Sequence, residues 1–184
     1  MSQPGADLVP EPSRDDHVRG SLDFPVVITE FGDFECPYCG DAATALDAVL
    51  AKYDGRVALV FRHYPLSMHP HARAAAEASE AAAAAGKFWQ MHDLLFRNQR
   101  ALTIPDLRTY ADAIGVDADA VEGAVARNTF RNRIERDVKS GNESGIEGTP
   151  SIFINGYAFD GEPSVEGLSE AVEQALAAAS AASR

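Results

Sequence analysis

The sequence contains only two cysteines among its 184 residues. Two cysteines exclude the disulfide-rich scaffolds of small secreted proteins, which need several pairs. Long apolar runs are lacking as well: the alanine-rich stretch 81–85 lies between Glu80 and Lys87, so the sequence predicts no transmembrane helix. Basic residues are few, because 16 Lys and Arg stand against 28 Asp and Glu, which leaves a formal net charge of −12. A chain this negative repels nucleic acid and anionic membrane surfaces, and we expect neither as a partner and no membrane insertion.

The sequence does contain enough apolar material for one core, since 46% of the residues are hydrophobic over a length typical of a single domain. Residues 1–22 are rich in Pro, Gly and Asp and lack periodicity. We therefore predict a flexible N-terminal arm over 1–22 and one domain over 23–184. The arm has no apolar segment of the kind that a secretory signal requires. We expect a cytoplasmic protein, unless an export signal was trimmed from the chain.

The apolar pattern predicts a strand–helix–strand unit near the start of the domain. Residues 25–31 (PVVITEF) and 56–64 (RVALVFRHY) are β-branched runs of strand length. Between them, apolar residues recur at spacings of three and four from Ala42 to Tyr53, which is typical of an amphipathic helix. In such a βαβ unit the two strands are parallel.

A helical block and a hairpin are predicted to follow. Residues from about 66 to 141 show helical periodicity and helix start signals, and we interpret them as a helical insertion. The apolar runs 151–154 and 157–159 flank Asn155-Gly156, the strongest hairpin signal in the chain. A last helix is predicted from about 164 to 179. This order, βαβ, helices, ββα, predicts an α/β fold around a central mixed sheet.

Both cysteines lie in the stretch FECPYCG, residues 34–40, directly after the first predicted strand. Cys36 stands at the start of the predicted helix, where unpaired backbone N–H groups and the helix dipole favour a thiolate. Pro37 suits the first helical turn, which does not need its missing N–H. The spacing places Cys36 and Cys39 on one side of that turn, within reach of a disulfide. We predict that Cys36 attacks and that Cys39 resolves the mixed disulfide.

Three other interpretations of the cysteines stay open. A zinc site would need two further ligands from His63, His69, His71 or acidic residues, which is poor zinc spacing. A purely structural disulfide would close a very short loop, and the stabilisation that a disulfide provides is smallest for short loops. The third interpretation, two inert buried cysteines, does not explain the proline between them.

A second feature lies more than a hundred residues later, where Gly148-Thr149-Pro150 immediately precedes the predicted hairpin. A proline at the first residue of a strand is structurally acceptable. Only about 5–6% of X–Pro bonds in folded proteins are cis. The residues alone therefore leave the isomer of this bond open.

Together these features resemble the DsbA-like thiol–disulfide oxidoreductases of the thioredoxin superfamily. The resemblance covers about residues 15–178 and rests on the runs EFGDFECPYCG, FRHYPLSMHPHARAAAEASEAA with KFWQMHDLLF, and EGTPSIFINGYAFDG. It is similar in particular to a bacterial branch whose domains occur alone or attached to sodium/proton antiporters. The resemblance implies a thioredoxin-like fold with a helical insertion and a cis Pro150 packed against the disulfide. It further implies that backbone beside Pro150 pairs with substrate and that Thr149 tunes reactivity.

The resemblance also implies a role for Glu30, because the family often carries a buried acid beneath the second cysteine. A carboxyl group shielded from water has a raised pKa and can relay a proton to or from Cys39. The alternative is that Glu30 caps an exposed strand edge. We expect Asp33 and Glu35 to be solvated loop charges. The histidines on either side of Pro70 are expected to cap a helix.

The sequence therefore predicts an enzyme that exchanges disulfides with cysteine-containing proteins or peptides and is recycled by an unidentified redox partner. Pro37 and Tyr38, between the cysteines, are expected to modulate the redox potential without determining it. No metal or organic cofactor is required, and a monomer is expected. Two other functions stay open: a thiol peroxidase or glutathione-linked reductase on the same fold, and a redox-sensing interaction domain. The residues do not set the direction of electron flow.

Overall fold

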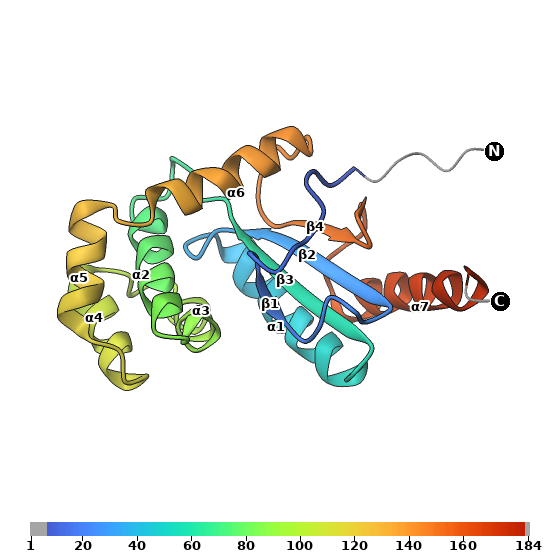
Figure 1. Cartoon of the computed structure of the whole chain (residues 1–184), viewed down its shortest axis with the longest axis horizontal. Coiled ribbons are helices and arrows are strands. Elements are labelled where there is room, and N and C mark those ends of the chain that lie inside the picture. Colours follow the sequence, from blue (N-terminus) through green and yellow to red (C-terminus); the bar gives the residue numbers. More distant parts are fainter. Residues whose placement is uncertain (1–6, 183–184) are drawn as a thin grey trace.

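The computed structural model describes residues 7–182 and contains a five-stranded sheet with helices on both faces (Figure 1). The strand order is β1-β3-β2-β4-β5, in which β2 and β3 are parallel and the other neighbouring pairs are antiparallel. The strands are β1 (His17–Arg19), β2 (Val26–Gly32), β3 (Val57–His63), β4 (Ser151–Ile154) and β5 (Tyr157–Ala158).

Seven helices lie within the described residues: α1 (Pro37–Lys52), α2 (Ala72–Ala84), α3 (Phe88–Arg97), α4 (Ile104–Ala113), α5 (Ala118–Arg127), α6 (Arg131–Glu143) and α7 (Val165–Ala182). None of these seven is both long enough and apolar enough to cross a membrane. The predicted fold class, a thioredoxin-like α/β fold around a mixed sheet, is confirmed by this arrangement.

The two central strands carry apolar side chains on both faces, because helices and loops cover both sides. Ile28 of β2 packs with Leu46 of α1 and Leu168 of α7 in one cluster. The odd-numbered side chains of β2 point to the opposite face, where Phe31 packs with Phe153 of β4. Residues of both faces are thus buried, which explains the continuous apolar run that the sequence shows.

The predicted hairpin is present as β4 and β5, joined by Asn155-Gly156. Both turn residues have positive φ angles, 49° for Asn155 and 85° for Gly156. A type I′ turn requires this conformation at both central positions, and Asn and Gly tolerate it best. On its other side, β4 pairs antiparallel with β2, the central strand of the sheet.

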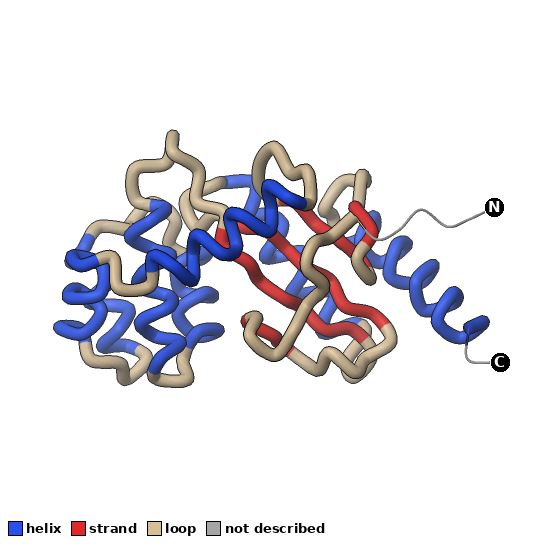
Figure 2. Tube along the Cα trace, turned by 45° about the horizontal axis from the view of Figure 1, so that its top comes forward, coloured by secondary structure: helices blue, strands red, loops and turns tan. Residues whose placement is uncertain are grey.

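The helices α2 to α5 gather at one end of the sheet, and α6 leads back across one face toward β4 (Figures 1 and 2). An aromatic and aliphatic cluster joins this block to the loop that carries the cysteines. Its members include Phe34 of the loop, Phe61 of β3, and Phe88 and Met91 of α3. The insertion is therefore packed against the region of the cysteines.

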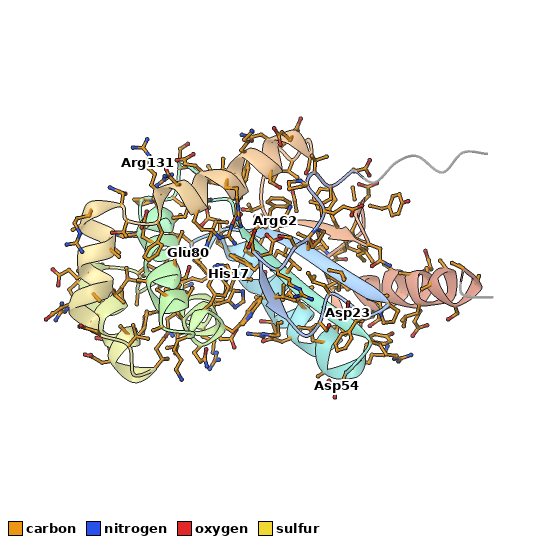
Figure 3. The ribbon with its side chains drawn as sticks, in the orientation of Figure 1. His17, Asp23, Asp54, Arg62, Glu80 and Arg131 are labelled. Atoms are coloured by element: carbon orange, nitrogen blue, oxygen red, sulfur yellow. The ribbon has the colours of Figure 1, made fainter. Side chains whose placement is uncertain are left out.

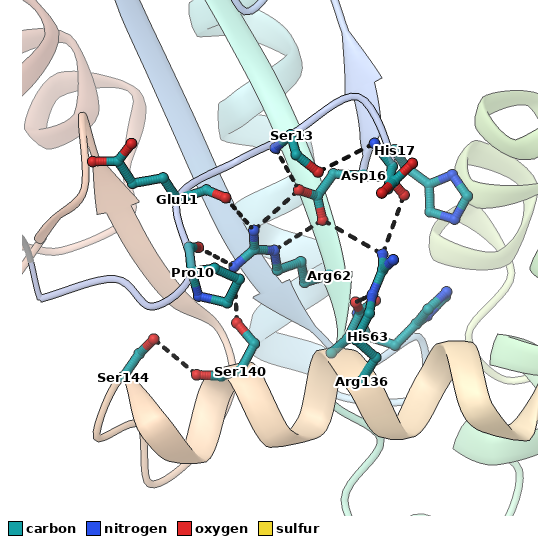
Figure 4. Close-up of polar contacts among 12 residues, drawn as sticks. Pro10, Glu11, Ser13, Asp16, His17, Arg62, His63, Arg136, Ser140 and Ser144 are labelled. Atoms are coloured by element: carbon teal, nitrogen blue, oxygen red, sulfur yellow. Dashed lines mark hydrogen bonds and ion pairs between the residues drawn. The ribbon is translucent and has the colours of Figure 1, made fainter.

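The prediction of a flexible arm over residues 1–22 is wrong for the part that the structure describes; residues 1–6 lie outside it. The strand β1 pairs antiparallel with β3 and forms an edge of the sheet. The buried guanidinium of Arg62 contacts both carboxylate oxygens of Asp16 at 3.0 Å and donates to the carbonyl of Pro10 at 2.9 Å (Figure 4). The composition of residues 1–22 predicted disorder because a sequence does not display contacts between residues that are far apart in the chain.

Candidate active site

The two cysteines lie where the loop after β2 enters α1. Cys36 is the N-cap residue, with extended backbone angles of φ −76° and ψ 119°, and Pro37 begins the helix. The N–H groups of Cys39 and Gly40 donate to the Cys36 carbonyl at 3.1 and 3.3 Å. Cys36 keeps 4% of its surface exposed and Cys39 none. An attacking group from solvent therefore reaches Cys36 before Cys39.

This environment lowers the pKa of the Cys36 thiol to about 5. The largest cause is a hydrogen bond from the Cys39 side chain, with further contributions from Thr149 and from the backbone N–H groups of Cys39 and Tyr38. These contributions outweigh the effect of burial, which acts in the opposite direction. Cys36 is consequently a thiolate at neutral pH, and the thiolate is the nucleophilic form.

Cys39 has the opposite character. Burial raises the pKa of its thiol far above the usual range, and the neighbouring Cys36 and Glu30 raise it further. Its sulfur accepts a weak hydrogen bond from the N–H of Asp33 at 3.5 Å. Cys39 therefore remains a protonated thiol at neutral pH and requires a base before it can act as a nucleophile.

Glu30 is a buried acid that interacts electrostatically with both cysteines. It points to the same face of β2 as Ile28, the face that packs against α1. Burial, with the negative charge of Cys36 as a second cause, raises the pKa of Glu30 to about 8. Neither carboxyl oxygen has a hydrogen-bond partner among the described residues. The strand-edge alternative is wrong, because Glu30 is fully buried on a central strand.

The segment before β4 meets Cys36 from across the fold. The Thr149–Pro150 peptide bond is cis. Sγ of Cys36 lies 3.5 Å from the backbone carbonyl oxygen of Thr149, which accepts a hydrogen bond from it when the thiol is protonated. The buried hydroxyl of Thr149 has no hydrogen-bond partner among the described residues. The structure thus brings two regions of the chain together that are 113 residues apart.

A cleft of about 610 Å³ opens beside this contact, between the start of α1, the Thr149-Pro150 segment and the residues before α7. Tyr38 lines the cleft and is 72% exposed, so we call it the Tyr38 cleft. Its lining residues are Tyr38, Asp41, Thr44, Ala45, Thr149, Pro150, Glu162, Pro163, Ser164 and Val165. The sequence prediction included only Tyr38, Thr149 and Pro150. The other residues were missed because α1 and the residues before α7 are far from each other in the chain and meet only in the fold.

Asp33 is not the solvated loop charge that the sequence suggested, since only 1% of its surface is exposed. One carboxylate oxygen accepts from the N–H of Leu66 at 2.9 Å and from His69 Nδ1 at 2.7 Å. The other accepts from the N–H of Glu35 at 2.8 Å. Asp33 therefore ties the cysteine loop to the loop that precedes α2.

The histidines around Pro70 pair with acids and do not cap a helix with their side chains. His69 contacts Asp33, and its pKa is raised first by this hydrogen bond and also by the negative charge of Cys36. His71 contacts Glu35 through both its N–H, at 2.6 Å, and its Nδ1, at 2.9 Å. His71 is the N-cap residue of α2 but makes no side-chain capping bond. Sequence reasoning missed these pairs because their members are 36 residues apart.

Gln99, between α3 and α4, is a site residue that sequence reasoning also missed. Its amide nitrogen donates to the carbonyls of Phe34 at 3.0 Å and Cys36 at 2.7 Å. The helical insertion thereby holds the backbone of the cysteine loop. No local signal in the sequence distinguishes this glutamine from a solvated one.

The histidines considered for zinc do not converge on the cysteines. Within residues 7–182, one group of three potential metal ligands is present: His17, His63 and Glu80. His63 Nε2 contacts Glu80 Oε1 at 2.7 Å, and His17 Nε2 contacts the same oxygen at 2.6 Å. Figure 3 shows His17 and Glu80 at the junction of the sheet and the helical block. Neither cysteine belongs to this group, so the described residues do not form a zinc site on the CxxC sequence.

Comparison with known proteins identifies the family. A family model described as Thioredoxin matches residues 13–174. An Na(+)/H(+) antiporter NhaA 3 of Salinispora tropica is 44% identical over 94% of this chain, which covers 26% of the antiporter. An NhaA 1 of Mycolicibacterium vanbaalenii is 40% identical over 89% of this chain and 27% of its own length. The chain thus spans about a quarter of the length of these relatives.

Solved structures support the fold. BdbD of Bacillus subtilis, in its oxidised form, aligns with a TM-score of 0.82 at 24% identity, over 89% of this chain and 94% of BdbD. The α-DsbA1 of Wolbachia pipientis aligns with a TM-score of 0.80 at 18% identity, over 94% and 96% of the two chains. At these identities the likeness establishes the fold. The resemblance to DsbA-like proteins is confirmed at that level.

Proposed function

Because this chain belongs to the thioredoxin family, we propose that it is a thiol–disulfide oxidoreductase whose redox centre is the pair Cys36 and Cys39. One observation carries the proposal: two cysteines of one turn have opposite protonation at neutral pH. Cys36, with a pKa of about 5, is a slightly exposed thiolate, whereas Cys39 is a buried thiol whose pKa is raised. Disulfide exchange needs one ready nucleophile and one protected resolving group.

The proposed reaction starts from the oxidised protein. A substrate thiolate attacks Sγ of Cys36, the bond between Cys36 and Cys39 breaks, and Cys39 leaves with the electron pair. Glu30 supplies the proton that Cys39 takes up. A second substrate thiolate then attacks the substrate sulfur of the mixed disulfide and expels Cys36 as a thiolate. Two substrate thiols are oxidised to one disulfide, and the disulfide of the protein is reduced to a dithiol.

We propose cysteine-containing proteins or peptides as substrates and a separate redox partner for recycling. The proximity of the Thr149 carbonyl to Cys36 supports an extended substrate segment beside Pro150. Among the structural neighbours, MdbA of Corynebacterium diphtheriae is a thiol–disulfide oxidoreductase. Pro37 and Tyr38 are exposed next to Cys36, where substitutions are expected to tune the potential. The cytoplasm remains the proposed compartment.

The experiment that tests this function uses two single-cysteine variants. Cys39→Ser is expected to accumulate mixed disulfides with cysteine-containing proteins through Cys36, because the resolving thiol is absent. Cys36→Ser is the matched control and is expected to form none, since Cys39 is buried. Non-reducing electrophoresis and mass spectrometry identify the adducts. Absence of adducts between Cys39→Ser and substrates that contain a disulfide, from which the Cys36 thiolate would expel one sulfur, contradicts the proposal.

A redox-sensing interaction domain is the second candidate function. It is favoured by the match to about a quarter of proteins that are named as Na(+)/H(+) antiporters. In this case the two oxidation states of the Cys36–Cys39 pair would bind a transporter with different affinity. Slow turnover of peptide substrates, together with binding to a transporter that changes with oxidation state, would favour this candidate over the first.

A further inference from the structure

The Tyr38 cleft combines an apolar surface with two carboxylates. Tyr38 and Val165 are large exposed apolar side chains, 72% and 37% exposed, and Pro150 lies between the start of α1 and the residues before α7. Asp41 and Glu162 are the two acids of the lining, and no Lys, Arg or His lines the cleft. The cleft therefore offers a cation two carboxylates, whereas it offers an acidic group no cationic partner.

These two acids differ from Asp33 and Asp47, which already have cationic partners. Asp33 pairs with His69 and is buried. Asp47, further along α1, pairs with Arg19. Asp41 and Glu162 are exposed, and neither side chain forms an ion pair or a hydrogen bond with the described residues. Their charge is therefore available to a bound partner.

The cleft is also placed to meet a substrate at the reacting sulfur. Thr149 and Pro150 line it, and the carbonyl of Thr149 lies 3.5 Å from Sγ of Cys36. An extended peptide advances about 3.3 Å per residue, and alternate side chains share a face. When the cysteine of a substrate peptide is bonded to Cys36, the side chain of a substrate residue one or two positions from that cysteine thus lies at this cleft.

We propose that Asp41 and Glu162 make the protein selective for peptides with Lys or Arg beside the reacting cysteine. This inference rests on the proposed disulfide exchange and names its substrate class. The alkyl part of a Lys or Arg side chain packs on Tyr38 and Val165 while its cationic group meets the carboxylates. A Glu or Asp at the same place is repelled. The net charge of −12 favours the encounter with cationic peptides in the same direction.

The test compares two peptides, each with two cysteines, that differ only in a Lys or a Glu beside the first cysteine. The rate at which each peptide reduces the oxidised protein is measured by acid quenching and mass spectrometry. The ratio of the Lys rate to the Glu rate is compared between the wild type and Asp41→Asn/Glu162→Gln. This comparison cancels the effect of the flanking charge on the thiol pKa of the peptide itself. The ratio is expected to fall by roughly two- to fivefold, the upper part of the range for an exposed ion pair.

The matched control is Asp54→Asn/Asp112→Asn, which removes the same net charge from exposed positions outside the cleft. Asp54 follows the far end of α1, about 20 Å along the helix from Asp41, and is labelled in Figure 3. The control is expected to change the ratio by less than twofold. The variant Asp41→Lys/Glu162→Lys reverses the charge of the cleft, and it is expected to react faster with the Glu peptide than with the Lys peptide.

The outcomes separate this inference from the function on which it rests. If the wild type oxidises both peptides but the ratio is the same in Asp41→Asn/Glu162→Gln, the cleft does not select and the inference is overturned. If the control lowers the ratio equally, net charge is responsible and the cleft assignment is overturned. If the wild type oxidises neither peptide, the proposed function fails first.

Discussion

The carboxylate of Asp33 accepts a hydrogen bond from His69 Nδ1 at 2.7 Å, next to the sulfurs of the active site. The same residue donates its backbone N–H to Cys39 Sγ and accepts the N–H of Cys36 at its carbonyl, at 3.1 Å. His69 therefore belongs to the electrostatic surroundings of the thiolate, although its hydrogen bond is to Asp33 and not to a cysteine.

Replacement of His69 by Gln tests this relationship. Asp33 raises the pKa of His69, so the imidazolium persists above the usual histidine range, and the charge of Cys36 contributes in the same direction. Because the attraction is mutual, His69→Gln is expected to raise the pKa of Cys36 by roughly 0.5 to 1 unit. Ultraviolet absorbance of the thiolate during a pH titration measures the change.

His71→Gln is the control, because His71 pairs with Glu35 at the surface. It is expected to shift the Cys36 titration less than His69→Gln does. If the pKa of Cys36 is the same in the wild type and in His69→Gln, the imidazolium of His69 does not act on the thiolate. The raised pKa of His69 also means that its stabilising contribution is present below the unfolded value of about 6.5 and is lost as pH rises through the folded value.

Because Glu30 is buried, we predict that the free energy of unfolding decreases as pH rises. Its pKa of about 8 in the folded protein exceeds the value of 4.5 for a free side chain, so the folded state holds the proton more tightly. Glu30 therefore lowers stability progressively as pH rises from about 4.5 to about 8. Glu30→Gln is expected to be more stable than the wild type by about 2 kcal/mol or more near pH 9. Urea unfolding at about pH 4 and about pH 9 measures the difference, which is expected only at the higher pH.

The same substitution has a kinetic consequence. Glutamine cannot exchange a proton with Cys39, so the attack of Cys39 on a mixed disulfide at Cys36, the reverse of the first proposed step, is expected to slow by roughly 10²- to 10⁴-fold, the usual contribution of a positioned acid or base. Single-turnover release of a fluorescent thiol from Cys36 measures this step. A variant that is more stable but resolves at the wild-type rate would leave Glu30 without a role in proton transfer.

The low pKa of Cys36 predicts an oxidising couple. A stable thiolate favours the reduced dithiol and so makes the disulfide a better oxidant. A glutathione titration of the Cys36–Cys39 pair is therefore expected to give a potential less negative than roughly −270 mV, the value for thioredoxin. In the reduced protein, thiolate absorbance is expected to titrate near pH 5. A midpoint near that of free cysteine, about 8.5, would contradict the proposed activation.

The buried pair Arg62 and Asp16 predicts how strongly the N-terminal segment is attached. Asp16→Asn leaves Arg62 with an uncompensated buried charge and is expected to cost about 3–5 kcal/mol of unfolding free energy. Burial alone would raise the pKa of Asp16, but its hydrogen bonds with Arg62 and Ser13 lower it. The contribution of Asp16 is thus present above pH ~3.8 and lost as pH falls below that value.

An exposed ion pair provides the control for this prediction. Arg73 and Glu135 lie 2.8 Å apart with both side chains more than a third exposed. Arg73→Met is expected to cost less than about 1 kcal/mol in the same denaturant titration. Equal costs for Arg73→Met and Asp16→Asn would show that the segment before β1 is weakly attached.

Much of the fold follows from local signals that act over a few residues. The β-branched runs of β2 and β3 and the apolar spacing of α1 predict the parallel βαβ unit, and Asn155-Gly156 predicts the hairpin turn. Hydrophobic periodicity and turn chemistry depend on neighbours along the chain, so a sequence displays them directly. The pairing of Asp33 with His69 has no such signal, because it depends on how two loops pack.

The amino-acid pattern alone is enough to predict that the only two thiols stand one turn apart at the start of a helix that follows a strand. The difference between these two thiols arises from the packing of the folded chain. Packing of α1 on the sheet buries Cys39 fully beside Glu30, while Cys36 keeps 4% of its surface exposed and faces the carbonyl of Thr149. Identical side chains differ in pKa because burial and hydrogen bonding act on each atom separately, and both depend on residues far away in the chain.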